Sequence, residues 1–322
     1  MTDTANLTFV LEPDTQAFID SLEGNPPIYT LSPADARDVL SGAQKSVNVK
    51  LAPADFEDRV LSVGPTGQTK IRIYRPTGAE GALPVVVYLH GGGWVLGDAD
   101  THDRLSRELA VGANAVVVFV DYERSPEQRY PVALEQSYAV YDYVAGHADE
   151  FGADASRIVI AGDSVGGNMA TVVALLAKER GGPAITAQLL LYPVTDASMS
   201  TPSYSQFADG PWLTKQAMVW FWDQYLPDLS KRADVHVSPI NASADQLKDL
   251  PQALVLTDEN DVLRDEGEAY GRNLTAAGVP VTSIRYNGTI HDFMLLNPIA
   301  ETQAVRGAVA QAVSYLKTVF GN

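Results

Sequence analysis

The sequence predicts an α/β fold with a mostly parallel central sheet, helices on its flanks and a helical cap. Three observations predict it. From about residue 82, short β-branched runs alternate with helical segments; no repeat or linker divides the 322 residues; and two helical regions interrupt the alternation. Strands that alternate with helices form mainly parallel sheets, because each helix carries the chain back across a covered face. We therefore expect one compact unit with an attached cap.

Six runs are predicted to be buried strands. Each is short, rich in β-branched or aliphatic residues, and bounded by residues that favour turns. Their continuous apolar character indicates strands that are covered on both faces. They span residues 84–90, 115–121, 157–162, 188–193, 252–257 and 281–286.

Helices are predicted between these strands. The last of them is expected to begin with Asp265 as its N-cap and to end before Gly278. Near the C-terminus, five apolar residues recur at spacings of three or four, which places them on one helix face that is expected to pack on the sheet. These five are Val305, Val309, Val313, Leu316 and Phe320, and the other expected helices span 102–111, 133–145, 165–178 and 265–277.

Two regions are expected to form the cap, whereas residues 51–322 form the main domain. Residues 1–50 have a helical pattern, and Ser32 followed by proline is a helix start signal. Residues 197–228 are rich in aromatic side chains, and Thr214 is expected to cap a helix there. The apolar stripe of that helix indicates either ordinary packing on the core or a lid over the strand ends.

The charge balance and the residue types exclude several classes of function. The chain has 23 basic and 40 acidic residues, a net charge of −17, so we expect no binding to nucleic acid or to an anionic membrane. An uncharged or cationic substrate is favoured instead. The lack of cysteine excludes disulfides, thiolate catalysis and cysteine-ligated metals. No apolar run reaches the ~18 residues of a membrane span and the N-terminus lacks a signal-peptide pattern, which together predict a cytoplasmic location.

The segment GDSVGG, residues 162–167, joins a predicted strand to a predicted helix. It lacks the G-x-G-x-x-G pattern of a dinucleotide-binding loop, and the chain has no Gly-Lys-Ser/Thr of a P-loop. It does match G-x-S-x-G, the nucleophile elbow, in the strand–turn–helix context that this motif requires. Ser164 is therefore the candidate nucleophile, and Gly162 and Gly166 flank it because a β-carbon at either position would crowd the turn.

A serine nucleophile needs a general base, which follows it and an acid in this arrangement. Of the five histidines, only His236 and His291 follow Ser164, and only His291 also follows an acidic loop. His291 lies beyond the last predicted strand and an Asn-Gly pair that predicts a turn. A histidine base predicts activity that rises with pH near the imidazole reference pKa of about 6.5.

The acid is expected in the loop after the strand at 252–257. This loop lacks the oxygen spacing and central glycine of a calcium-binding loop. The pattern alone does not rank its three candidates, Asp258, Glu259 and Asp261.

Four motifs together resemble the hormone-sensitive-lipase-like carboxylesterases, also called bacterial family IV. The motifs are LHGGGW at 89–94, GDSVGG at 162–167, DVLRDEG at 261–267 and HDFM at 291–294. The resemblance implies an α/β-hydrolase fold whose cap is formed by the two irregular regions. It also implies a catalytic triad of Ser164, Asp261 and His291, which ranks Asp261 above the other acids, and it implies no metal and no organic cofactor.

The resemblance also assigns residues around the triad. It implies an oxyanion hole formed by the N–H groups of Gly92, Gly93 and Val165. Val165 stands where the family usually has alanine, a difference expected to narrow the acyl pocket slightly. His90 and Trp94 are expected to be structural. The suggested walls of the substrate pocket are Tyr192, Phe207, Trp212 and Phe221.

The function that the resemblance implies is hydrolysis of short-chain acyl or aryl esters, and a homodimer is the assembly expected by analogy. Acyl transfer and the cleavage of amides or lactones use the same triad, so the sequence does not distinguish these reactions from ester hydrolysis. The remaining alternative is a non-catalytic binding protein on the same fold. Such proteins commonly lack a member of the triad, whereas this chain has all three.

Overall fold

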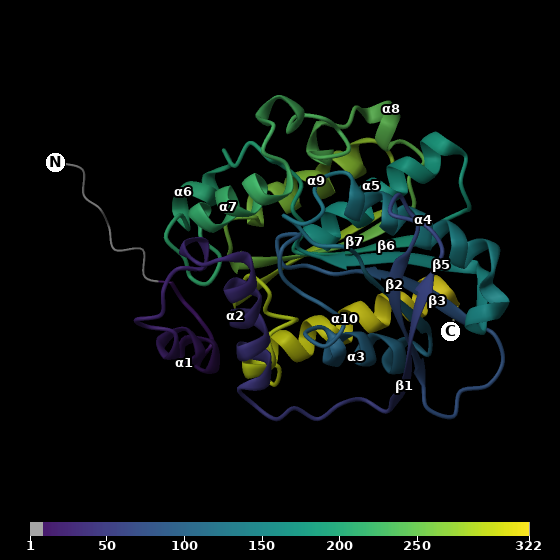
Figure 1. Cartoon of the computed structure of the whole chain (residues 1–322), viewed down its shortest axis with the longest axis horizontal. Coiled ribbons are helices and arrows are strands. Elements are labelled where there is room, and N and C mark those ends of the chain that lie inside the picture. The colour runs from purple at the N-terminus through teal and green to yellow at the C-terminus, as the bar shows by residue number, and fades with distance from the viewer. Residues whose placement is uncertain (1–8, 322) are drawn as a thin grey trace.

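The computed structural model describes residues 9–321, which form one eight-stranded sheet with helices on both faces (Figure 1). The strands lie in the order β1-β2-β4-β3-β5-β6-β7-β8. Residues 1–8, which begin both the expected cap segment and the N-terminus without a signal-peptide pattern, lie outside the described residues. The strands are β1 (Ala54–Leu61), β2 (Thr69–Pro76), β3 (Leu83–Leu89), β4 (Val116–Asp121), β5 (Ala153–Asp163), β6 (Ala187–Leu191), β7 (Gln252–Asn260) and β8 (Val281–Ile290).

The mostly parallel sheet is confirmed, and all six predicted strands are present. Strands β3 to β8 pair in parallel, and every residue of β3 and β6 is buried, as their apolar runs predict. Parallel strands end at the same edge of a sheet, so the loops after β3, β5, β7 and β8 lie close together. These are the loops that carry the four motifs.

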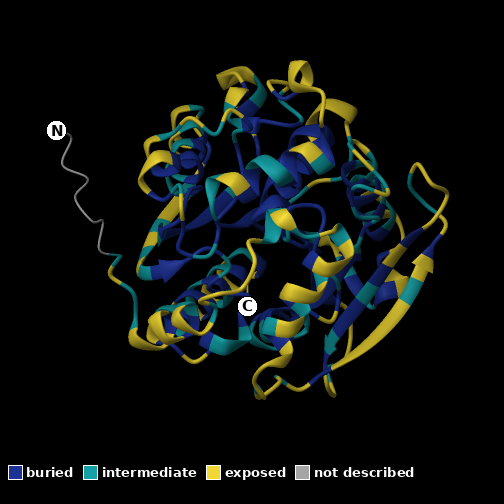
Figure 2. Cartoon of the chain, turned by 60° about the vertical axis from the view of Figure 1, so that its left-hand side comes forward, coloured by how far each residue is buried: buried dark blue, intermediate teal, exposed yellow. Residues whose placement is uncertain are grey.

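Two strands, β1 and β2, were not predicted. They pair antiparallel with each other at one edge of the sheet, and β2 pairs antiparallel with β4. Most side chains of β1 are exposed, including Phe56 and Val60, so its sequence has no buried apolar run. Figure 2 shows this exposed outer edge beside the buried centre of the sheet.

Helices α3 and α10 cover one face of the sheet, and α4, α5 and α9 cover the other (Figure 1). The predicted C-terminal stripe is confirmed, since four of its five apolar residues are buried and Val313 is half-buried. No helix within residues 9–321 has both the length and the apolar character needed to cross a membrane. The helices are α3 (Asp103–Ala113), α4 (Val132–Gly146), α5 (Val165–Arg180), α8 (Ala244–Leu247), α9 (Arg264–Ala276) and α10 (Gln303–Phe320).

Two local predictions are wrong. Asp265 is not the N-cap of α9, because that position is Leu263 and the Asp265 carboxylate accepts from the Ser203 N–H instead. The expected turn at Asn287–Gly288 lies inside β8, where Gly288 takes a φ of +73° and donates its N–H to Glu259. In both cases a tertiary hydrogen bond outweighs the local signal.

The two regions assigned to the cap lie together at one end of the sheet (Figure 1). Ser32 and Thr214 cap their helices as predicted, each accepting from a backbone N–H three residues ahead. The helices of these regions are α1 (Pro13–Ser21), α2 (Pro33–Lys45), α6 (Pro202–Gln206) and α7 (Lys215–Tyr225). Short 3₁₀ helices lie at Ile28–Thr30, Ala148–Phe151, Leu229–Lys231, Pro239–Asn241 and Asn297–Ile299.

Candidate active site

The serine between glycines lies on a sharp turn between β5 and α5. Ser164 has φ +54° and ψ −120°, a conformation that side chains rarely adopt. The turn packs tightly against β3: a β-carbon on Gly166 would lie 1.9 Å from the carbonyl oxygen of Leu89, and one on Gly162 would lie 2.3 Å from the carbonyl oxygen of Gly166. The glycines are therefore required by contact with backbone atoms, and the serine hydroxyl is held at the start of a helix.

The serine, histidine and acid converge at the carboxyl ends of three strands. The Oγ of Ser164 lies 2.9 Å from Nε2 of His291, and Nδ1 of His291 lies 2.9 Å from Oδ2 of Asp261. All three residues are buried. The second oxygen of Asp261 accepts from the N–H of Leu263, which fixes the carboxylate. A continuous hydrogen-bonded line thus runs from hydroxyl to imidazole to carboxylate.

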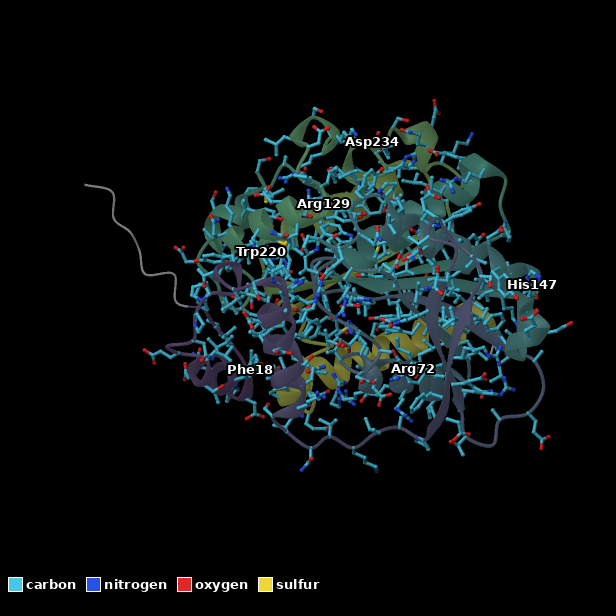
Figure 3. All side chains as sticks on the ribbon, viewed as in Figure 1. Phe18, Arg72, Arg129, His147, Trp220 and Asp234 are labelled. Carbon is cyan, nitrogen blue, oxygen red and sulfur yellow. The ribbon has the colours of Figure 1, made fainter. Side chains whose placement is uncertain are left out.

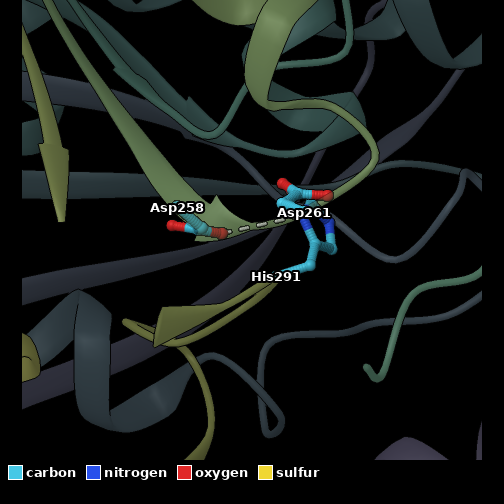
Figure 4. A group of neighbouring side chains, drawn as sticks. All are labelled: Asp258, Asp261 and His291. Carbon is cyan, nitrogen blue, oxygen red and sulfur yellow. Dashed lines mark hydrogen bonds and ion pairs between the residues drawn. The ribbon is translucent and has the colours of Figure 1, made fainter. Parts of the chain in front are cut away.

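The structure separates the three acids that the sequence leaves open. Figure 4 shows Asp258 and Asp261 on the same side of His291, with Asp258 farther away. The Asp258 Oδ2 lies 3.9 Å from Nδ1 of His291, beyond hydrogen-bonding distance. Glu259 is turned away and accepts from Gly288. Asp261 is the acid that binds the imidazole.

Asp258 is a buried carboxyl, and within residues 9–321 neither of its oxygens has a hydrogen-bond partner. Burial raises its pKa well above the usual value, and the nearby carboxylates of Asp261 and Asp292 raise it further. Two carboxylates this close cannot both ionise easily, so Asp258 keeps its proton.

Replacing Asp258 with asparagine is expected to stabilise the protein increasingly, relative to wild type, as the pH rises. The unfolded chain ionises this carboxyl above a pKa of about 3.9, whereas the folded chain keeps the proton. Between these two pKa values the wild-type chain takes up a proton when it folds. Its free energy of unfolding therefore falls by up to about 1.4 kcal/mol for each pH unit of increase. The asparagine variant cannot take up this proton, so its stability does not fall in this way. Urea unfolding at several pH values between 5 and 8 measures the difference. A difference that does not change with pH would show that Asp258 is ionised in the fold.

His291 binds protons more strongly than a free imidazole. Burial lowers its pKa, but the carboxylates of Asp261 and Asp292 outweigh burial and raise the pKa to about 9. Tyr192 packs edge-on against the ring, with ring centroids 5.1 Å apart. The reference value of about 6.5 that the sequence suggests therefore does not apply to this histidine.

The loop after β3 lies beside the serine. Gly92 and Gly93 have φ values of +102° and +62°, and both line the cavity that contains Ser164. A β-carbon on Gly93 would lie 2.0 Å from the ring of Phe221. The N–H of Val165 belongs to the first turn of α5 and has no acceptor within the helix. This arrangement is suited to binding an oxyanion.

A buried polar cluster beneath this loop was not predicted. Asp163 accepts from the hydroxyl of Tyr88 and the N–H of Gly91, and its other oxygen lies 3.3 Å from Nε2 of His102. Burial would raise the pKa of Asp163, but the pairing with His102 lowers it. The residue next to the serine thus ties the end of β5 to the glycine loop. The only sequence signal for this cluster was the acidic residue directly after the apolar run 157–162.

His90 and Trp94 have the structural roles that were expected. His90 stacks on Tyr122, with ring centroids 4.0 Å apart, and burial lowers its pKa to about 3. The ring is therefore neutral at ordinary pH and supports the loop by packing. Trp94 stacks on Tyr225 at the end of α7, again at 4.0 Å.

The cavity above Ser164 has a volume of about 610 Å³, within the usual range for a small-molecule site. Trp212 and Phe221 line it, whereas Tyr192 and Phe207 do not. Tyr192 lies behind His291, and Phe207 packs on Phe9 under the side chain of Arg264. The acidic residues and histidine that line the cavity are Asp20, Glu23, Asp209, His291 and Asp292. Among the described residues, no lysine or arginine lines it.

One group within residues 9–321 has the spacing of a metal site. Asp258, Asp261 and His291 place one possible ligand atom each within 4.8 Å of one another. The Nδ1 of His291 is already bound to Asp261, and all three side chains are buried. A cation here would break the hydrogen-bonded line to Ser164, so we assign no metal to these residues.

Comparisons with known proteins agree with this fold. A family model described as the alpha/beta hydrolase fold matches residues 86–295. A carboxylesterase of Mycobacterium tuberculosis is 38% identical over 309 residues, covering 94% of this chain and 96% of that protein. An ethyl acetate hydrolase of Pseudomonas putida is 35% identical over 301 residues, covering 90% of this chain and 94% of that protein. The crystal structure of a thermostable esterase from Pseudomonas putida has a TM-score of 0.94 and 54% identity, covering 96% of this chain and 98% of that one.

The fold and these similarities define the class, which is that of ester hydrolases with the α/β-hydrolase fold. Within it, the chain belongs to the hormone-sensitive-lipase-like family. The family model matches more than half of the chain, and the relatives match nearly all of it. The predicted fold class and the predicted hydrolase class are both confirmed.

Proposed function

We propose that the chain hydrolyses short-chain acyl or aryl esters through an acyl-enzyme on Ser164, with His291 as general base and Asp261 as the acid. The observation that carries this proposal is the hydrogen-bonded line through the three side chains, at 2.9 Å and 2.9 Å. Because Nδ1 donates to the Asp261 carboxylate, Nε2 is left to accept the serine proton.

The proposed reaction uses these groups in order. Nε2 of His291 takes the hydroxyl proton while Oγ of Ser164 bonds to the ester carbonyl carbon. The N–H groups of Gly92, Gly93 and Val165 hold the oxyanion that forms. As the carbonyl is restored, the bond to the alcohol breaks and Nε2 returns its proton to that alcohol. A water then attacks the acyl-enzyme in the same way, and the acid is released.

The cavity supports a neutral, mostly apolar substrate. Its walls are largely apolar, and the charged side chains among its described residues include carboxylates but no lysine or arginine. An anionic acyl group would therefore meet repulsion from carboxylates near the serine. The relatives named for carboxylesterase and ethyl acetate hydrolase activity agree with this substrate class.

A panel of nitrophenyl esters of increasing acyl length tests the proposal. We expect turnover of the acetate and butyrate esters and a decline for long acyl chains, because the cavity is of limited volume. The same assay with an added alcohol measures acyl transfer against hydrolysis. Absence of turnover on every ester would overturn the proposed function.

The activity is expected to increase with pH up to the alkaline range. Only the neutral imidazole accepts the serine proton, and a pKa of about 9 keeps His291 protonated at lower pH. The value of kcat/KM should therefore rise from pH 6 onward with a midpoint at about pH 9. A profile that is already flat above pH 7 would contradict the raised pKa.

We also propose that residues 1–50 and 197–228 act as a cap over the site. Side chains from both regions line the cavity, including Ile19 and Val39 from the first and Trp212 and Phe221 from the second. A cytoplasmic location and a homodimer are further proposals, supported by the composition and the family resemblance respectively. Light scattering of the purified protein tests the dimer.

A further inference from the structure

Asp292 directly follows His291 and lines the catalytic cavity. Its Oδ1 accepts no hydrogen bond from the described residues and lies 3.4 Å from Nε2 of His291, the atom that lies 2.9 Å from Oγ of Ser164. The nitrogen that must accept the serine proton therefore has both a hydroxyl and a carboxylate within reach. A carboxylate at this position stabilises the protonated imidazole and competes with the serine.

The other oxygen of Asp292 is held by the cap. Its Oδ2 accepts the indole N–H of Trp212 at 2.9 Å. The Trp212 ring packs on Phe18 of α1, with ring centroids 5.4 Å apart, and Figure 3 labels Phe18 on the cap side of the molecule. One hydrogen bond thus connects both cap regions to the residue beside the catalytic histidine.

Both partners of this bond have strained backbones. Trp212 has φ +64° and Asp292 has φ +65°. Such residues persist only where the surrounding structure holds them, and they cluster at functional sites. Trp212 also lies between two cavities, since it lines the catalytic cavity and a neighbouring one beside α1 and α2. A molecule that fills either cavity contacts the residue that holds Asp292.

Asp292 and His291 shift each other's pKa, and nearby groups act on both residues. Burial raises the pKa of Asp292 above its usual value, and His291 and the Trp212 N–H offset only part of this rise. Asp258 has no such donor and keeps its proton. After Asp261, Asp292 contributes most to the raised pKa of His291. The charged or titratable groups that act on this pair are Tyr88, His102, Asp163, Tyr192, Asp258 and Asp261.

We propose, on the basis of the proposed function, that Asp292 is a positioning residue that controls how readily His291 accepts the serine proton, and that Trp212 sets the position of Asp292. While the indole holds Oδ2, the carboxylate stays off Nε2 and Ser164 keeps its hydrogen bond. When the cap moves and the indole leaves, Asp292 closes on Nε2. His291 then stays protonated and paired with the Asp292 carboxylate, so it cannot accept the serine proton. The position of the cap thereby controls the triad.

The test compares the pH profile of kcat/KM on a nitrophenyl ester for wild type, Trp212→Phe, Asp292→Asn and the double variant. Trp212→Phe keeps the packing on Phe18 but lacks the N–H, so its midpoint should move to higher pH. Asp292→Asn removes the carboxylate, so its midpoint should fall by about one pH unit or more. The double variant should match Asp292→Asn alone, because Trp212 acts only through Asp292.

Trp220→Phe is the matched control. Trp220 is also half-buried and in the same cap region, where Figure 3 labels it, but it does not line the cavity. Its pH profile should equal that of wild type, and titration with an organophosphonate counts the active sites in each variant, which separates misfolding from a shifted midpoint. An unmoved midpoint in Asp292→Asn, or equal effects of Trp212→Phe with and without Asp292, would overturn the inference. A wild type that hydrolyses no ester would instead overturn the proposed function.

Discussion

Replacing Ser164 with alanine is expected to lower kcat by about 10⁴-fold or more, because the variant has no hydroxyl to form the acyl-enzyme. Alanine keeps the β-carbon, so the strained backbone of the turn is unaffected by the change. The substitution removes the hydroxyl that hydrogen-bonds to Nε2 of His291 and leaves the bond between His291 and Asp261 in place. Steady-state hydrolysis of a nitrophenyl acetate measures the effect.

Ser205→Ala provides the control for this prediction. Ser205 is an exposed serine on α6, and surface substitutions of this kind usually change stability by less than about 0.5 kcal/mol. Its activity should equal that of wild type. Near-normal hydrolysis by the Ser164 variant would show that another group is the nucleophile.

Replacing Asp261 with asparagine is expected to lower kcat by about 10⁴-fold, the loss that the equivalent change causes in another serine triad. The amide can donate a hydrogen bond to Nδ1 of His291, which places the ring proton on Nε2. The imidazole then cannot accept a proton from Ser164. Asparagine keeps the shape of the side chain and the hydrogen bond from the Leu263 N–H. The fall in kcat therefore measures the effect of the changed His291 tautomer and of the lost carboxylate charge.

Asp258→Asn is the matched comparison, since it makes the same chemical change at the neighbouring carboxyl. Asp258 makes no hydrogen bond to the histidine and is protonated. Its kcat near neutral pH should therefore stay within a few-fold of wild type. If Asp258→Asn were the more damaging change, the assignment of the acid would be reversed.

The sequence predicts the central strands and the site because their signals are local and chemically specific. Buried parallel strands read as continuous apolar runs, and β3 and β6 are buried throughout. The serine is recognisable from its flanking glycines, which contact backbone atoms and tolerate no substitute. The choice among the three acids needed the family resemblance, because all of them follow the same strand.

Other features could not be read from the sequence because they depend on contacts between distant segments. The edge strand β1 has mostly exposed side chains, so it lacks a burial pattern. Tyr192 and Phe207 are aromatic like the true wall residues, and only the fold places them outside the cavity. The link between Trp212 and Asp292 joins residues 80 positions apart through one hydrogen bond.

Covalent labelling by an organophosphonate, followed by peptide mass spectrometry, tests most directly whether Ser164 is the activated nucleophile. We expect one label per chain, on Ser164, with activity falling in proportion to labelling, and much slower labelling when His291 is replaced by alanine. Complete labelling of Ser164 with activity retained, or inactivation with the label on a different residue, would contradict this assignment.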